Sequence, residues 1–153
     1  MNEFERLLME LNSLIEGNEY DITILANSSA LLFNNLKNLN WVGFYKLKDN
    51  FLYLSAFQGN PACIKIKVGS GVCGHTILVN DTVVVNNVHE FKGHIACDSS
   101  SKSEICVPIY KNNKVYGLLD IDSPIYNRFN DEDKIFFEKV ASIISKALDS
   151  TSF

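Results

Sequence analysis

The sequence predicts an α+β domain in which a central antiparallel sheet carries N- and C-terminal helices packed on one face. Apolar residues recur at helical spacing over 3–15, over 21–36 and from 131 onward. Between them lie aromatic and β-branched runs separated by turn residues, such as WVGFYKL and FLYLSAF around KDN, which is typical of a hairpin. The order of two helices, then strands, then a closing helix indicates the α+β class.

The helical segments carry clear internal signals. The first helix repeats its apolar residues at Phe4, Leu7, Leu8, Leu11, Leu14 and Ile15. The last helix is expected to begin at Asp131 with Asn130 as N-cap, because acidic residues follow where the helix dipole favours them. Its core face comprises Phe136, Val140, Ile143, Ile144 and Leu148.

The middle of the chain is predicted to form strands and one short helix. In CIKIKV, strict alternation predicts that Ile64, Ile66 and Val68 share one face. HTILVN is a candidate short helix, TVVVNNV a strand, and 89–103 a long loop. EICVPIY and VYGLLDID are two strands joined by Asn112-Asn113, residues that tolerate the positive φ of a tight hairpin turn.

Length and composition bound the class of protein. The 153 residues, 46% hydrophobic and 21% charged, predict a single domain over 1–153. A net charge of −4 and a pI of about 5.3 disfavour a nucleic-acid binder. No run approaches the roughly 18 apolar residues of a membrane span, and the acidic, amphipathic start MNEFERLLMELN is unlike a secretory signal. We therefore expect a cytoplasmic protein, in which a permanent disulfide framework is unusual.

The string GSGVCG matches G-x-G-x-x-G, a pattern found in dinucleotide-binding folds. No parallel βαβ unit is predicted around it, and the helix that follows is short. A tight turn that needs glycine φ angles is the favoured interpretation.

The four cysteines stand at 63, 73, 97 and 106 and contain no C-x-x-C pair. The histidines at 75, 89 and 94 do not complete a familiar zinc spacing either, so no metal cofactor is expected. Cys106 lies between Ile105 and Val107, as a buried packing residue would. Cys97 instead lies in GHIA–C–DSSS, a polar setting that suits a reacting thiol. Cys63 and Cys73 fit either role.

Acidic residues gather at one predicted strand end. Asp120 and Asp122 bracket Ile121 and share a face, and Glu104 begins the neighbouring strand of the same hairpin. They form either a solvated strand end or an acidic pocket for an ammonium group, which offers three donors and no acceptor. Trp41 opens a strand, where its indole either packs in the core or walls a pocket.

Several long motifs, in the right order, carry a resemblance to a known family. NWVGFYKL, FQGNPACIKIKVGSGVCG, NNVHEFKGHIACDSSSKSEICVPI and GLLDIDSPIYNRFNDEDKIFFEKV resemble the free methionine-(R)-sulfoxide reductases, enzymes built on a single GAF domain. The resemblance covers about residues 20–148 and departs from the family pattern at His75-Thr76. It implies a GAF-like fold.

The resemblance also implies residue roles. Cys97 would be the attacking thiol, with Cys63 and Cys73 as its redox partners and Cys63 favoured as the first. The substrate pocket would be built from Trp41, Tyr45, Glu104, Asp120 and Asp122.

The implied chemistry is thiolate attack on the sulfoxide of free methionine, a sulfenic acid and then an intramolecular disulfide. A thioredoxin-type dithiol would reset the enzyme, with no metal or organic cofactor. Backbone amides of the 93–98 turn would lower the pKa of the attacking thiol. The alternative function is a stand-alone redox or small-ligand sensor without turnover. Terminal helices of this kind suggest a homodimer.

Overall fold

The computed structural model describes residues 1–95, 97 and 99–152, and its centre is a six-stranded antiparallel sheet. The strand order is β3-β2-β1-β6-β5-β4. The strands are β1 (Trp41–Lys48), β2 (Phe51–Gly59), β3 (Lys65–Lys67), β4 (Val83–Val85), β5 (Ser103–Lys111) and β6 (Lys114–Ser123). The predicted α+β class is confirmed.

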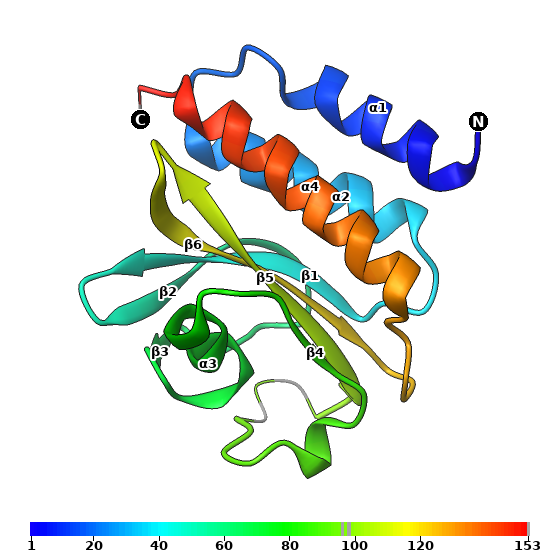
Figure 1. The fold of residues 1–153 in the computed structure, drawn as a ribbon, viewed down its shortest axis with the longest axis vertical. Helices are drawn as coiled ribbons and strands as arrows, with labels where there is room; N and C mark the ends of the chain where they lie inside the picture. Colours follow the sequence, from blue (N-terminus) through cyan, green and yellow to red (C-terminus); the bar gives the residue numbers. More distant parts are fainter. Residues whose placement is uncertain (96, 98, 153) are drawn as a thin grey trace.

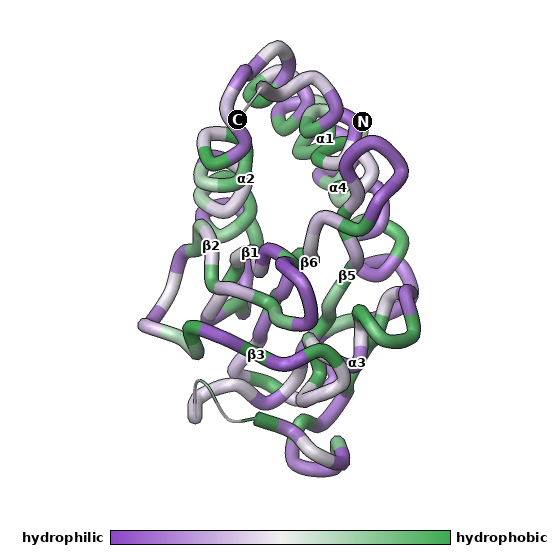
Figure 2. Tube along the Cα trace, turned by 90° about the vertical axis from the view of Figure 1, so that its left-hand side faces the viewer, coloured by the Kyte–Doolittle hydropathy of each residue, from purple (hydrophilic) through white to green (hydrophobic). Residues whose placement is uncertain are grey.

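Helices lie on both sides of this sheet. Helices α1 (Glu3–Ile15), α2 (Asp21–Asn35) and α4 (Asp131–Asp149) lie together on one face, as predicted (Figure 1). Helix α3 (Gly71–Val79) and the segment that contains the 3₁₀ turn η1 (Val88–Glu90) lie on the opposite side (Figure 1). Figure 2 shows the same separation from the side, with α1, α2 and α4 at one end of the molecule and α3 at the other.

The predicted helix and turn signals are present in the structure. The Asn130 side chain accepts a hydrogen bond from the Asp133 N–H at 2.9 Å, and Asp133 accepts one from the Asn130 N–H, which completes a capping box. Asn112 and Asn113 have φ of 52° and 64°, as a type I′ hairpin turn requires. The capping box sets where α4 begins, and the asparagine turn sets where β5 ends and β6 begins.

The face under the three helices is an apolar core. Along β1, Val42 and Phe44 point into it, and alternate residues of β5 and β6 do the same. The helices contribute fully buried Leu11, Ile24 and Ile144. A cluster that combines α1, α2, α4 and three central strands holds these elements in a fixed arrangement.

The opposite face of the same strands is smaller and more polar. Trp41 and Tyr45 alternate with Val42 and Phe44 along β1 and therefore project to this side. Their neighbours include the buried thiols of Cys73 and Cys106 and the buried carboxyl groups of Glu104 and Asp120. The chemistry-bearing residues thus lie on the face away from the terminal helices.

Two details of the predicted strands and helices are wrong. The alternation in CIKIKV does not extend to Ile64, which is 77% exposed, because β3 begins only at Lys65 and only Ile66 of this run is buried. Helix α3 begins at Gly71, before the HTILVN segment. The glycine-turn interpretation of GSGVCG agrees with the structure, since Gly69 and Gly71 have φ of 93° and 62°.

The described strands pair only antiparallel, so no parallel βαβ unit of the dinucleotide type surrounds this turn. Within the described parts of the chain, none of the helices has both the length and the apolar character needed to cross a bilayer.

Candidate active site

Strand register gathers the predicted acidic residues on one face. Glu104 of β5 is the cross-strand partner of Asp122 of β6, and Asp122 is also the partner of Trp41 of β1. Asp120, two residues before Asp122, shares its face and pairs with Cys106. Directly opposite residues have Cβ atoms only about 5 Å apart, so the pairing brings the carboxyl groups together.

The aromatic side chains of β1 form one wall of the site. Trp41 is 2% exposed, and its indole N–H donates to the backbone oxygen of Asn60 at 3.0 Å. Its ring stacks on Phe57, with centroids 5.2 Å apart. A Cβ at Gly43 would lie 2.6 Å from the Trp41 ring, so only glycine lets the indole fold over the strand. The indole position is therefore fixed by its neighbours.

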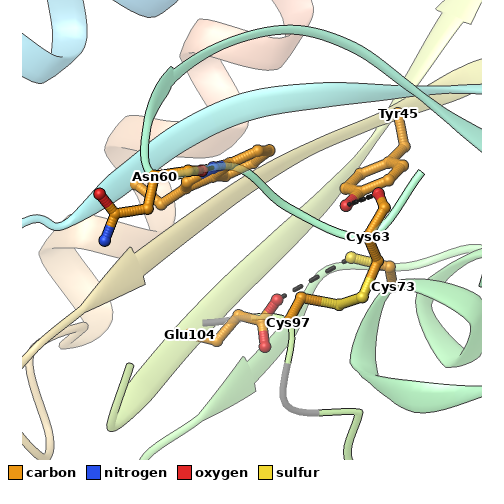
Figure 3. Close-up of a disulfide and its surroundings, with 7 residues drawn as sticks. Tyr45, Asn60, Cys63, Cys73, Cys97 and Glu104 are labelled. Carbon is orange, nitrogen blue, oxygen red and sulfur yellow. Dashed lines mark hydrogen bonds between the residues drawn. A yellow bond between two sulfur atoms is a disulfide. The ribbon is translucent and has the colours of Figure 1, made fainter. Parts of the chain in front are cut away.

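Cys63 and Cys97 form a disulfide, the pairing that the family resemblance implied. Their Cα atoms are 5.3 Å apart, within the normal range for a disulfide. The Tyr45 hydroxyl donates to the backbone oxygen of Cys63 at 2.8 Å and so ties this end of the bridge to β1 (Figure 3). The disulfide joins the segment before β3 to the loop before β5.

Hydrogen bonds join the two ends of the loop that carries Cys97 and attach its C-terminal end to the sheet. The Val88 N–H donates to the Lys102 oxygen at 2.9 Å, and the Lys102 N–H donates to the Ser123 oxygen at 2.8 Å. The Asn40 side chain donates to the Ser101 hydroxyl at 3.0 Å. A Cβ at Gly71 would come within 3.1 Å of the loop's Ile95 side chain, so glycine permits the loop to approach α3 closely.

A small cavity of about 40 Å³ lies between these elements. Seven of the eight predicted site residues line this cavity: Trp41, Tyr45, Cys73, Cys97, Glu104, Asp120 and Asp122. The eighth, Cys63, is joined to Cys97 by the disulfide. His94, Ile95 and Ser101 also line it and were not singled out from the sequence. Their only sequence signal was their closeness to Cys97 in the chain.

Cys73 and Cys106 remain free thiols, and both are buried. The burial predicted for Cys106 is confirmed, but its surroundings are not simply apolar. Its sulfur lies 3.6 Å from that of Cys73 and donates to the Asp120 carboxyl at 3.3 Å and to Glu104 at 3.5 Å. Sequence reasoning missed this because Cys73 reaches the sheet only through the packing of α3.

Burial and crowding shift the protonation of these groups. Burial and the negative charges of Asp120 and Asp122 raise the pKa of Glu104 well above its ordinary value. The contact with the Cys106 thiol favours ionisation of Cys73, but burial and the two aspartates outweigh it and raise the Cys73 pKa to about 12. Burial, the Cys73 contact and Asp120 raise the pKa of Cys106. The site therefore disfavours additional negative charge.

The predicted amide support for the Cys97 thiolate falls partly outside the described residues, because Ala96 and Asp98 are not among them. The Cys97 N–H itself donates to the Ile95 oxygen at 3.0 Å.

Comparison with known proteins agrees with this arrangement. The GAF domain family matches residues 22–148. The chain is 43% identical over 144 residues to the free methionine-R-sulfoxide reductase of Escherichia coli K12, a match that covers 94% of this chain and 87% of the relative. The reduced form of fRMsr from Staphylococcus aureus superposes with a TM-score of 0.93 at 52% identity, covering 97% of this chain and 96% of that one.

A structure of the free methionine-R-sulfoxide reductase from Neisseria meningitidis in complex with its substrate superposes with a TM-score of 0.92 at 34% identity. It covers 96% of this chain and 89% of that one. The fold and the family match define a GAF-domain protein. Within that class, the chain belongs to the family of free methionine-R-sulfoxide reductases.

Proposed function

We propose that the protein reduces free methionine (R)-sulfoxide to methionine, with Cys97 as the attacking thiol and Cys63 as the thiol that resolves the intermediate. The observation that carries the proposal is a single cavity that is lined by the disulfide-bonded Cys97, three carboxyl groups and an indole. The names of relatives at 41–43% identity support the same reaction and the R epimer.

In the first step the Cys97 thiolate attacks the electrophilic sulfur of the sulfoxide. The sulfur–oxygen bond breaks, a proton is taken up, methionine leaves, and the oxygen stays on Cys97 as a sulfenic acid. The Cys97 sulfur is oxidised by two electrons and the substrate sulfur is reduced by two.

A proton donor at the sulfoxide oxygen assists this step. Glu104 suits the role because burial and the neighbouring aspartates raise its pKa well above the ordinary value, which favours the protonated carboxyl group. It also lines the cavity together with Cys97.

Substrate recognition falls to the remaining acids and the aromatic wall. Asp120 and Asp122 are placed to accept hydrogen bonds from the α-ammonium group, whose positive charge offsets their mutual repulsion. No lysine or arginine is among the described residues that line the cavity. Trp41 and Tyr45 offer apolar ring surface to the methyl and methylene groups.

The second step forms the bridge that the structure contains. The Cys63 thiolate displaces hydroxide from the Cys97 sulfenic acid, and after proton transfer the products are the Cys63–Cys97 disulfide and water. We assign Cys73 to a later exchange with this disulfide, since it lines the same cavity as Cys97.

The electrons that reopen the disulfide come, in this proposal, from a thioredoxin-type dithiol, which fits a cytoplasmic protein. We also propose that residues 1–153 act as one domain and form a homodimer through the terminal helices, where Met9, Leu14 and Ile22 are exposed. Light scattering of the full chain measures the second point.

The deciding test of the reaction is turnover. The protein is incubated with thioredoxin, thioredoxin reductase, NADPH and resolved R or S methionine sulfoxide. Continued NADPH oxidation with the R epimer, to many equivalents per chain, is expected. Consumption that stops after one equivalent would instead show a redox sensor and contradict the proposal.

A further inference from the structure

Four buried side-chain atoms that could bind a metal lie close together and come from three different elements, and three of the four residues line the cavity. They are the sulfurs of Cys73 in α3 and Cys106 in β5 and one carboxyl oxygen each of Glu104 and Asp120, all within 4.8 Å of one another. Figure 3 shows two of the four contributors, Cys73 and Glu104, with the hydrogen bond that joins them. The proposed reaction uses Glu104 and Asp120 but gives no part to the Cys106 thiol.

The spacing of these atoms is that of a tetrahedral zinc site. Zinc–sulfur bonds of about 2.3 Å and zinc–oxygen bonds of about 2.0 Å place neighbouring ligands about 3.8 Å apart for two sulfurs and about 3.5 Å for sulfur and oxygen. The two sulfurs here are 3.6 Å apart. The sulfur–oxygen distances are 3.9 Å for Cys73–Glu104, 3.5 Å for Cys106–Glu104 and 3.3 Å for Cys106–Asp120. The donors need only small movements to surround one ion.

The charge balance of the cluster also favours a cation. Its residues are at most 6% exposed, and burying carboxyl groups beside thiols is costly unless a positive charge compensates them. An ammonium group would pair with the carboxylates alone. Two sulfur donors in addition select a softer divalent ion, because thiolates favour zinc over magnesium or calcium.

We propose that Cys73, Cys106, Glu104 and Asp120 form a Zn²⁺ site, and that the ion competes with the substrate for the two acids. The zinc site stands on the geometry alone, whereas the competition rests on the proposed function. Binding releases the thiol protons, so the affinity rises with pH. Zinc is here an inhibitor of the reductase and takes no part in the reaction.

The site is tested on the full chain that carries the Cys63–Cys97 disulfide, with Cys73 and Cys106 verified as thiols by mass spectrometry. In this form Cys63 and Cys97 cannot act as thiolate ligands. Zinc is titrated in competition with a chromophoric chelator, and one ion per chain with submicromolar affinity is expected. Cobalt(II) in place of zinc should give thiolate-to-metal charge-transfer absorption and the intense visible bands of a tetrahedral site.

Two kinds of variant locate the ligands. Cys106→Val and Cys106→Ala should each weaken zinc binding by at least about 100-fold and remove the charge-transfer band, since loss of a ligand exceeds the usual cost of an outer-shell change. His94→Ala is the matched control, because His94 lines the cavity outside the cluster, and it should bind zinc as the wild type does. Circular dichroism checks that each variant is folded.

Four outcomes would overturn the site: equal zinc affinity in wild type and both Cys106 variants, the weak bands of octahedral cobalt, loss of binding in His94→Ala, or a Cys73–Cys106 disulfide in place of metal binding. The competition between zinc and substrate is measured separately, as a rise in the apparent KM of the wild type for methionine sulfoxide when zinc is added. A protein that binds zinc but shows no reductase activity would contradict the proposed function and leave the zinc site standing.

Discussion

The two faces of the central sheet are built from the same strands and differ in what they bury. Under α1, α2 and α4 the alternate residues are apolar, as with Val42, Phe44 and Ile121. On the other face the residues next to them in sequence are Trp41, Tyr45 and Asp120, which line one cavity together with the disulfide-bonded Cys97. The comparison teaches that the apolar face stabilises the fold, and that this stability offsets the cost of burying polar and acidic groups on the other face.

The largest effect should come from the reacting thiol. Cys97→Ser replaces one sulfur in a half-buried loop, so the fold should persist while turnover falls by roughly 10³-fold or more, as for other removed nucleophiles. Steady-state assays of wild type and variant, with circular dichroism of both, measure this contrast. Activity above about a tenth of wild type would remove Cys97 from the role.

A substitution on the helix-covered face is expected to lower stability and leave activity nearly unchanged. Phe137 is 1% exposed and meets Phe136 edge-on, with ring centroids 5.1 Å apart. Phe137→Ala should lower the free energy of unfolding by about 3–5 kcal/mol, because it leaves a cavity in the core. At temperatures where the variant is folded, its kcat should stay close to that of the wild type. A large fall in kcat without loss of stability would show that the two faces are not separable in this way.

A change in the acidic cluster should affect recognition more than stability. Asp120→Asn removes a charge proposed to face the substrate ammonium, and a lost charged hydrogen bond costs about 2–3 kcal/mol, or about 100-fold in kcat/KM. Unfolding by denaturant should show the variant to be as stable as the wild type or more so, since mutual repulsion among the carboxyl groups falls. Unchanged kcat/KM would mean that Asp120 does not contact the substrate.

The smallest effect concerns an acid outside the site. Burial alone would raise the pKa of Asp21, but hydrogen bonds from Tyr116, at 2.7 Å, and from Lys46 outweigh it and hold the pKa below 3.8. Because the pKa of Asp21 is lower in the folded state, its carboxylate stabilises the protein at pH values above the ordinary pKa of aspartate. This stability is lost as the pH falls through the pKa that Asp21 has in the folded state.

Asp21→Asn should therefore cost about 1 kcal/mol near pH 7 and progressively less below about pH 4. Urea titrations at both pH values measure the difference, with the exposed Glu19→Gln as a control of equal charge change. A cost that stays constant with pH would show that the charge of Asp21 is not responsible.

Much of the fold could be predicted from local sequence signals. The Asn130 cap, the Asn112-Asn113 turn and the shared face of Asp120 and Asp122 each depend on a few neighbouring residues. The approach of Glu104 to Asp122 followed from the hairpin that joins β5 and β6. These features do not depend on distant parts of the chain.

The remaining features depend on contacts that the sequence does not encode locally. The contact of Cys73 with Cys106 requires α3 to pack on β5, and the exposure of Ile64 depends on where β3 begins. The Cys63–Cys97 pairing was available only through the family resemblance, because four cysteines allow several pairings. A rule based on spacing along the chain could not bring together Cys73, Glu104, Cys106 and Asp120, because their donor atoms come from three separate elements.

The central claim is that acidic residues on the polar face of the sheet recognise the free α-ammonium group of methionine sulfoxide. Its most direct test compares kcat/KM for the free R epimer and for the N-acetylated R epimer, with the same reductant and the wild-type protein. Acetylation replaces the ammonium with a neutral amide and leaves the acids without their partner, so a loss of about 100-fold or more is predicted. Comparable values for the two substrates would contradict the claim.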